Sequence, residues 1–261
     1  MSPDIAHIGI FNLMLCVLLV GIAGVSSMIY SLGFERDLLV GTVRTFVQLF
    51  LLGYILKVIF ELDRGVVVVG VFGFMILFAA WTVISRVKKA PIPLFRSVFL
   101  SMLASYMVTA YAVTAFVIDV EPWWKPQYFI PIGGMIIGNS MNAAAIALER
   151  LLGELKGRRG EVEMMLCLGA DYREASRKMV QNAMRAGMIP SINAMMTVGI
   201  VFIPGMMTGQ ILSGADPLIA IRYQIVVMLM LVGSTSLGTL LIVLLVRKRC
   251  FGRGQTLILT R

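Results

Sequence analysis

Residues 127–148 read QYFIPIGGMIIGNSMNAAAIAL, a stretch without a single charged side chain. The hydrocarbon core of a bilayer is about 30 Å thick, and a helix needs about 20 predominantly apolar residues to cross it. Backbone N–H and C=O groups in lipid must pair within the protein, which favours a helix over irregular chain. The stretch therefore predicts a transmembrane helix.

Six other stretches have the same apolar character. The seven predicted spans are residues 5–30, 38–60, 65–85, 97–118, 127–148, 186–212 and 223–246. Hydrophobic residues make up 59% of the chain and charged residues 14%, against roughly half and roughly a quarter in soluble proteins. The sequence predicts an all-α, polytopic integral membrane protein with about seven transmembrane helices in one domain, residues 1–261.

Basic residues gather in three of the connecting segments, 86–96, 149–185 and 247–261. Loops rich in Lys and Arg stay in the cytosol, so the N-terminus is expected outside and the C-terminus in the cytosol. The net charge of +9, from 23 basic and 14 acidic residues, is then a topology signal. We expect the lipid membrane as a partner, and no nucleic acid.

Residue types that carry catalysis are scarce. The single histidine, His7, stands at the start of the first span, which excludes a His-based triad and a His-rich metal site. The phosphate-binding pattern G-x-x-x-x-G-K-[ST] does not occur, so ATP is not bound by that route. Cys16, Cys167 and Cys250 show no metal-ligand spacing. We expect no catalytic residue and no cofactor bound by this chain, and metal-contacting residues stay unassigned.

One helical face of the 127–148 span carries polar side chains. Met135, Asn139 and Asn142 follow at steps of four and three, which places them on a single face. Polar side chains in membrane helices face a bundle interior or a pathway, so this face is a candidate substrate path. Interhelical packing is the alternative, since Gly134 and Gly138 form a GxxxG pattern.

Two weaker path candidates lie elsewhere. Gln48 stands one turn after Arg44 in the second span, although Arg44 can also snorkel to the membrane interface. Met206 and Met207 follow a Pro-Gly pair inside the sixth span. That pair predicts either a break that exposes carbonyls and thioethers to a cavity or a plain proline kink.

The connection at about 149–185 is long enough to have its own structure. Its amphipathic middle leads to Gly169-Ala170, after which Asp171 and Glu174 have the spacing of a capping box. The pattern predicts a helix, a glycine elbow and a second short helix.

Six stretches in order along the chain match a known pattern. They are RTFVQL (44–49), IGNSMNAA (137–144), EMMLCLGA (163–170), IPSIN (189–193), PGMMTGQIL (204–212) and RYQI (222–225). In these stretches the chain resembles the FetB-type permeases of bacterial iron-export ABC transporters.

The resemblance implies a permease subunit rather than an enzyme, paired with a separate ABC ATPase that uses ATP. It implies a homodimer of the permease that exports iron across the bacterial cytoplasmic (inner) membrane and supports resistance to oxidative stress. It also implies that the 149–185 connection is a cytosolic segment that couples the permease to the ATPase. The coupling candidates in it are Glu163, Leu168, Gly169, Ala170 and Glu174.

Two other functions are compatible with the residues alone. A stand-alone, ion-gradient-driven carrier of metals or small molecules should transport without ATP. A seven-helix receptor should respond to a ligand and show no flux.

The basic loops lead to a prediction of topology. In a cysteine-free background, a single cysteine at Gly157 should be labelled only by a membrane-permeant thiol reagent, whereas one at Asp119 should react from outside. The reason is the excess of Lys and Arg around Gly157. External labelling at Gly157 would contradict the predicted orientation.

Overall fold

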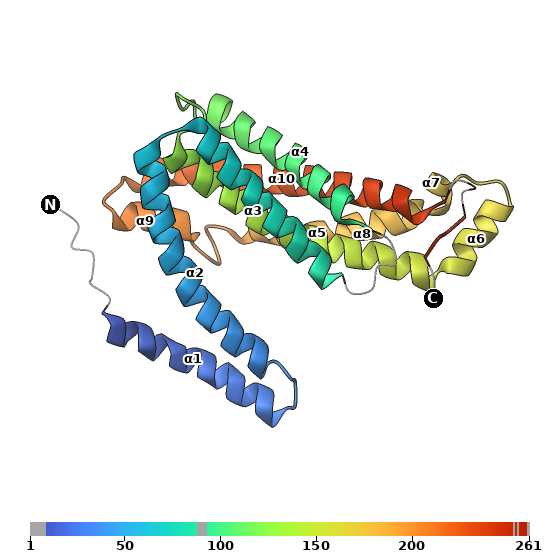
Figure 1. Ribbon diagram of the computed structural model, residues 1–261, viewed down its shortest axis with the longest axis horizontal. Coiled ribbons are helices and arrows are strands. Elements are labelled where there is room, and N and C mark those ends of the chain that lie inside the picture. The colour runs from blue at the N-terminus through green and yellow to red at the C-terminus, as the bar shows by residue number, and fades with distance from the viewer. Residues whose placement is uncertain (1–8, 88–92, 253, 255, 260–261) are drawn as a thin grey trace. The chain divides into compact units, whose positions relative to one another are not determined.

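The structure is a computed structural model that describes residues 9–87, 93–252, 254 and 256–259 (Figure 1). Within these residues it is helical, apart from turns and two isolated bridges. Contacts divide the chain into two compact units. Unit 1 comprises Met1–Asp63 and Leu212–Gly214, and unit 2 comprises Arg64–Ile211 and Ala215–Arg261.

Unit 1 is a pair of helices, α1 (Ile10–Ile29) and α2 (Glu35–Leu62). Ser27 holds the turn between them, because its hydroxyl donates to Glu35 Oε1 at 2.8 Å and accepts the backbone N–H of Phe34 at 3.0 Å. Most apolar side chains of the pair are exposed within this unit. Such surfaces suit contact with lipid rather than water.

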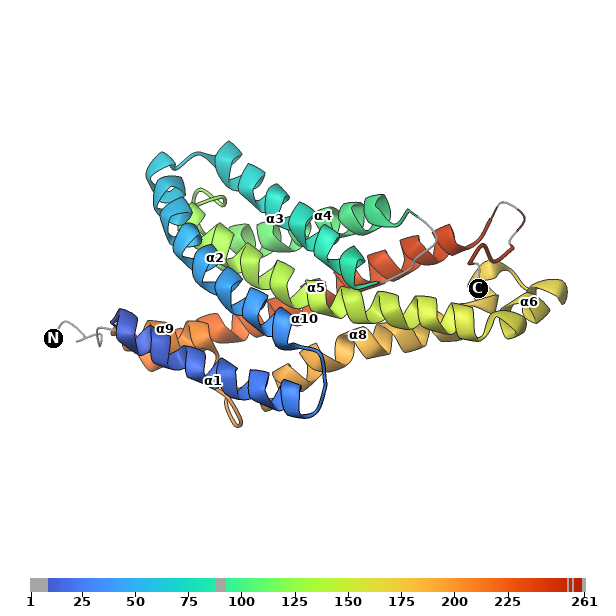
Figure 2. The same ribbon diagram turned by 60° about the horizontal axis from the view of Figure 1, so that its bottom comes forward.

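Unit 2 holds the remaining helices. They are α3 (Gly65–Arg86), α4 (Phe95–Ala112), the π-helical turn η1 (Val113–Val117), α5 (Pro126–Gly157), α6 (Arg159–Cys167), α7 (Tyr172–Ala175), α8 (Arg177–Thr197), α9 (Gly205–Leu212, whose last residue groups with unit 1) and α10 (Pro217–Cys250). The long helix α5 packs against α3, α8 and α10, and α10 also packs against α4 (Figure 2).

Small residues let these long helices approach closely. Phe72 of α3 meets Phe129 of α5 edge to face, with ring centroids 5.1 Å apart. Gly133 makes room for this ring, since a Cβ there would stand 2.4 Å from Phe72 Cε2. Gly238 of α10 does the same for Tyr106 of α4, with 2.6 Å to Cε1. Packing of this kind is the main attraction between helices in lipid.

Helix α8 is held against α5 and α10 at Gly187. A Cβ at this position would lie 2.8 Å from the carbonyl oxygen of Ala143 and 3.0 Å from the Cβ of Ala147, both on α5. It would also lie 3.3 Å from Cγ2 of Thr239 on α10. The three helices therefore meet at a position that has room only for a hydrogen.

Six helices of the described residues are long and apolar enough to cross a membrane. They are Phe11–Ile29, Glu35–Leu62, Gly65–Arg86, Phe95–Val117, Pro126–Gly157 and Pro217–Cys250. They coincide with six of the seven predicted spans, so the all-α, polytopic fold is confirmed. The exact number of spans and the orientation of the termini stay predictions. The start of the 5–30 span, with His7, lies outside the described residues.

The predicted 186–212 span is wrong as a continuous helix. Helix α8 begins at Arg177 and ends at Thr197, and α9 starts only at Gly205. Between them Val198 is extended and Gly199 has a φ of +81°. Several β-branched residues and Pro204 follow, and both disfavour helical backbone. The structure thus has a break and not a proline kink.

The predicted 127–148 helix ends too early. Helix α5 continues to Gly157, because Leu151 and Leu155 bury fully against the bundle and extend its apolar stripe. With 32 residues it is about 48 Å long, and α10 with 34 residues is about 51 Å long. Both exceed a hydrocarbon core of about 30 Å. The short helices α6 and α7 follow the end of α5, at one end of unit 2 (Figure 1).

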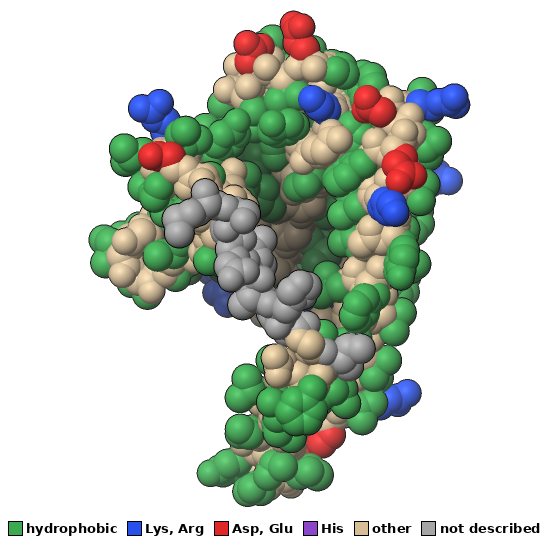
Figure 3. Space-filling view, turned by 90° about the vertical axis from the view of Figure 1, so that its left-hand side faces the viewer, with side chains coloured by type: hydrophobic (Ala, Val, Ile, Leu, Met, Phe, Trp, Pro, Cys, Tyr) green, Lys and Arg blue, Asp and Glu red, His purple; other side chains and the backbone are tan. Residues whose placement is uncertain are grey.

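The outer surface is largely apolar. Hydrophobic side chains cover much of the face in Figure 3, with charged side chains scattered between them. Apolar patches of this extent are rare on soluble monomers. The surface agrees with a protein that is solvated by lipid.

Close packing at Gly187 leads to a stability prediction. Gly187→Ala should destabilise the protein by about 1–3 kcal/mol, because the new methyl group overpacks against the backbone of α5. The matched control is Gly70→Ala in α3, where no atom lies within 4 Å of the added Cβ; helix propensity predicts a gain of up to about 1 kcal/mol there. Thermal unfolding in detergent measures both. Equal melting temperatures for the two variants would contradict the helix contact.

Candidate functional site

The polar face of α5 lies on the surface of unit 2. Asn139 and Asn142 are exposed and Met135 is partly exposed. Asn139 Nδ2 donates to the carbonyl oxygen of Met135 at 3.1 Å, a bond within the helix. Asn142 Oδ1 accepts from Nη1 of Arg86, in the last turn of α3, at 3.0 Å. The face is thus an uncovered polar stripe within unit 2, with one interhelical hydrogen bond.

Within unit 2, the GxxxG pair of α5 makes no close helix contact. Gly138 has no neighbouring atom within 4 Å of an added Cβ, and Gly134 meets only the flexible end of Met75 at 3.5 Å. The close contacts fall instead on Gly133 and on the buried Ala143 and Ala147. Packing therefore uses the opposite side of α5 from the two asparagines.

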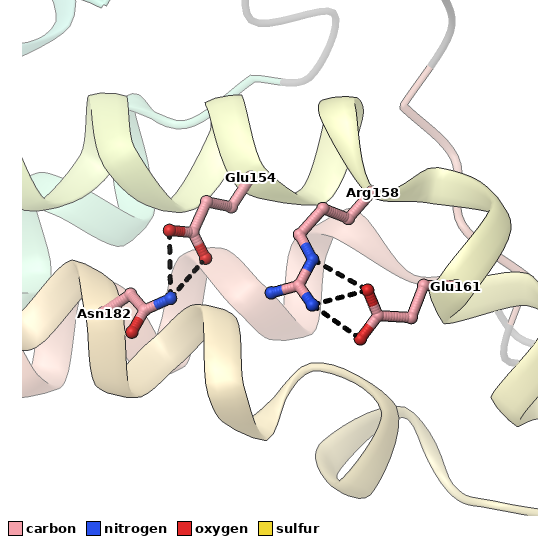
Figure 4. A network of polar contacts seen from close by, with 4 residues as sticks. All are labelled: Glu154, Arg158, Glu161 and Asn182. Carbon is pink, nitrogen blue, oxygen red and sulfur yellow. Dashed lines mark hydrogen bonds and ion pairs between the residues drawn. The ribbon is translucent and has the colours of Figure 1, made fainter.

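Further along α5 the same face borders a groove of about 740 Å³ between α5 and α8. Figure 4 shows Asn182 of α8 pointing toward Glu154 of α5, where its Nδ2 lies 3.0 and 2.9 Å from the two carboxylate oxygens. Glu154 also pairs with Arg150 at 2.7 Å. Arg158 turns instead to Glu161 of α6 with two hydrogen bonds, of 2.7 and 2.8 Å. Glu154 thus joins α5 to α8, and Arg158 and Glu161 fix the turn from α5 into α6.

The break between α8 and α9 borders a second groove, of about 430 Å³. Its lining is mainly apolar and includes the thioethers of Met195, Met207 and Met228. Gln224 also lines it, and its side chain is buried with an amide oxygen that has no hydrogen-bond partner among the described residues. Met206 is not among the lining residues. Of the two predicted methionines, Met207 therefore lines this groove and Met206 does not.

Gln48 lies on α2 in unit 1, where its side chain and that of Arg44 are exposed. Unit 2 contains the other path candidates. Among the described residues, no three or more His, Cys, Asp or Glu side chains are grouped so that they could hold a metal ion.

The predicted glycine elbow is present between α6 and α7. The N–H of Gly169 bonds to the carbonyl oxygen of Leu166 and that of Ala170 to Met165, both at 3.1 Å. These two bonds form a Schellman motif, which needs a left-handed residue after the helix. Gly169 supplies it with a φ of +94°. Leu168, next to it, is 80% exposed, so the elbow presents an apolar tip.

The predicted capping box is also present. The backbone N–H groups of Arg173 and Glu174 donate to Asp171 Oδ1 at 2.8 and 2.7 Å, and the N–H of Asp171 donates to Glu174 Oε2 at 3.2 Å. Glu163 pairs with Arg159 one turn before it at 2.6 Å. The two predicted coupling glutamates thus stabilise α6 and α7 locally. Leu168, Gly169 and Glu174 are all exposed, and Leu168 is the one with a large apolar side chain.

Three polar residues of this region were missed from the sequence. Arg86 reaches Asn142, and Glu154 bonds to Asn182 across 28 positions of chain. Arg86 stands in the last turn of its helix, where a basic residue predicts the topology of the span and not a partner. The partner of Arg86 is 56 positions away, so local spacing carries no trace of the pair.

The fold and these surfaces define a polytopic, α-helical membrane protein with an ordered elbow between α6 and α7. The chain belongs to the uncharacterised protein family UPF0014, whose pattern matches residues 10–251.

Three relatives are similar over most of their length. UPF0014 membrane protein slr1647 of Synechocystis sp. is 38% identical, over 82% of this chain and 83% of the relative. UPF0014 membrane protein YjkA of Bacillus subtilis is 35% identical, over 94% and 97%. The probable iron export permease protein FetB of Escherichia coli is 32% identical, over 96% and 95%. No solved structure matches the chain.

Proposed function

We propose that this chain is the membrane-spanning permease subunit of an ATP-driven ABC exporter whose cargo is iron. A separate ABC ATPase subunit binds and hydrolyses ATP, and this chain carries the pathway. In a bacterial cytoplasmic membrane, such export lowers cytosolic iron and supports resistance to oxidative stress. Two copies of the permease and two ATPase subunits form the complex.

Two kinds of observation support this proposal. The relative named as a probable iron export permease aligns along nearly the whole of both chains. Six apolar helices can cross the membrane, while α5 and α10 are long enough to project from it. A chain built in this way can move a cargo and contact a soluble subunit.

The observation that carries the ATPase contact is the elbow of Leu168, Gly169 and Ala170. Its turn is held by the Schellman bonds on one side and the capping box on the other. The exposed Leu168 side chain stands on this ordered turn. An apolar side chain on a preorganised tip can enter a groove of a partner at little entropic cost. On this proposal, the end of unit 2 that carries α6 and α7 lies in the cytosol.

For the pathway we favour the α5 face with Met135, Asn139 and Asn142. Its polar groups lie on the side of α5 that does not pack against the bundle. The Asn142 oxygen accepts one hydrogen bond from Arg86. Its second lone pair remains for a cargo, and the Arg86 guanidinium then stands beside that cargo. Met207 and the groove at the α8–α9 break are a second candidate, and Gln48 a third.

The proposal as a whole is tested in proteoliposomes. The purified chain, with and without a lone ABC ATPase of the same genome, is supplied with ferrous iron and ATP. Stimulated ATP hydrolysis and ATP-dependent iron movement are expected only with both subunits. Iron movement by the chain alone, driven by an ion gradient, would favour a stand-alone carrier.

The elbow gives one specific prediction. Gly169→Val should uncouple transport from ATP hydrolysis, because a β-branched residue at positive φ distorts the Schellman turn beneath Leu168. Gly169→Asn is the matched control, since asparagine tolerates the left-handed region. ATPase stimulation should fall about tenfold in the valine variant, equivalent to about 1.4 kcal/mol. Unchanged copurification and flux in Gly169→Val would rule out this contact.

The α5 face gives the other prediction. Asn142→Leu should lower iron efflux about tenfold, the rate equivalent of about 1.4 kcal/mol. Folding should change little, because interhelical polar contacts in membranes average only about 0.6 kcal/mol. Efflux and melting temperature are measured on the same reconstituted protein.

Ser140→Ala provides the control for this test. Ser140 is on α5 as well, buried and 3.1 Å from the hydroxyl of Thr235 on α10, so its loss also removes one interhelical polar contact. Transport per folded molecule should stay normal in Ser140→Ala. Normal transport in Asn139→Leu and Asn142→Leu alike would remove the α5 face from the pathway.

A further inference from the structure

The end of the chain after α10 is folded onto the bundle. The C-terminal tail, residues 251–259 of which 253 and 255 lie outside those described, turns back on itself. The N–H of Gly252 bonds to the carbonyl oxygen of Thr256, and the N–H of Ile258 to that of Cys250, both at 2.9 Å. Phe251 and Leu257 form an antiparallel bridge. An unstructured basic terminus would lack these backbone hydrogen bonds.

One side of the tail is apolar and covered. Phe251 is 8% exposed, Leu257 5% and Leu259 4%, whereas Ile258 between the two leucines is 47% exposed. This alternation is the period of an extended strand with one buried face. The tail therefore packs as a structural element, and the bulk of its burial comes from three side chains.

The tail contacts both helices that flank the elbow. On α6, Nη1 of Arg159 donates to the carbonyl oxygen of Leu259 at 2.9 Å. On α7, the ring of Tyr172 lies 5.5 Å from that of Phe251. The last turn of α10 takes part too, since the guanidinium of Arg247 lies 5.6 Å from the centre of the Tyr172 ring, within cation–π range.

Tyr172 is itself held in place from its own helix. Nε of Arg173 donates to the Tyr172 hydroxyl at 3.2 Å, and its guanidinium lies 5.7 Å from the ring centre. The hydrogen bond from Arg173 lowers the pKa of the Tyr172 phenol. The ring is thus a fixed contact between α7, the end of α10 and Phe251.

These contacts give α6 and α7 a second connection to the long helices, in addition to the chain itself. The chain already joins α6 to α5 through Arg158 and α7 to α8 through Ser176. We propose that the C-terminal tail joins both to α10 and positions the elbow. On the proposed function, a displacement of Leu168 by the ATPase then reaches α10, which packs against α4, α5 and α8. Phe251, Leu259 and Tyr172 are positioning residues, and the ATPase itself contacts the elbow.

The test compares Leu259→Ser with Ile258→Ser, the same kind of change at adjacent positions that are buried and exposed. Hydrogen exchange is measured across residues 159–175 of the full chain in detergent. Amides there should exchange about fivefold faster in Leu259→Ser and at the normal rate in Ile258→Ser, as local opening depends on buried apolar contacts. Equal exchange in the two variants would overturn the positioning role.

The functional readout uses proteoliposomes with the ABC ATPase, ferrous iron and ATP. Copurification with the ATPase should persist in Leu259→Ser, since the elbow residues are unchanged. Iron moved per ATP hydrolysed should fall about fivefold, the lower end of typical couplings between distant sites. A normal ratio in a folded Leu259→Ser protein would overturn the proposed transmission to α10.

Two further variants keep the test decisive if Leu259→Ser does not fold. Tyr172→Leu removes the ring that meets Phe251 and Arg247, and Tyr172→Phe restores it. Tyr172→Leu should show the same loss of coupling and Tyr172→Phe a normal ratio; normal coupling in both overturns the inference. A wild-type chain that neither binds nor stimulates the ATPase would defeat the proposed function instead, and the exchange experiment would still decide the role of the tail.

Discussion

Every backbone N–H and C=O group in lipid needs a hydrogen-bond partner, and the rest of the structure depends on this requirement. Within an apolar chain this need allows long helices and little else. It explains why 127–148, with its glycines and Pro131, is nevertheless helical throughout. It also makes the break at 198–204 conspicuous. Within a membrane, irregular backbone is tolerated only where protein or a cavity surrounds it. A groove with three methionines borders this break.

Close approach of the helices follows from the same constraint. Lipid tails are as apolar as leucine, so helices gain little from hiding apolar side chains from one another. Contact at short range replaces that gain, and it falls at Gly133, Gly187 and Gly238. Helix α5 takes part in two of the three contacts. One side of α5 makes these contacts, and the side with Asn139 and Asn142 remains exposed within unit 2.

The region around α6 and α7 is ordered by other forces than the apolar spans. Around α6 and α7, ion pairs, a capping box and an aromatic cluster hold short helices that could not persist alone. On the proposed function, this end lies outside the bilayer, where a soluble partner is within reach. Order at Leu168 therefore comes from polar and aromatic contacts rather than from lipid.

Local chemistry explains what the sequence alone determined. Apolar runs of sufficient length identified six spans. The glycine elbow at Gly169 and the Asp171–Glu174 box were also predicted, because neighbouring residues determine both. Longer-range features were decided by the tertiary structure. Gly134 and Gly138 matched a packing pattern, yet Gly133 makes the close contact because the position of Phe72 selects it. Likewise Arg86 finds Asn142, and Arg159 finds Leu259 across 100 positions. Such pairs depend on how separate helices are placed, and no local spacing encodes that placement.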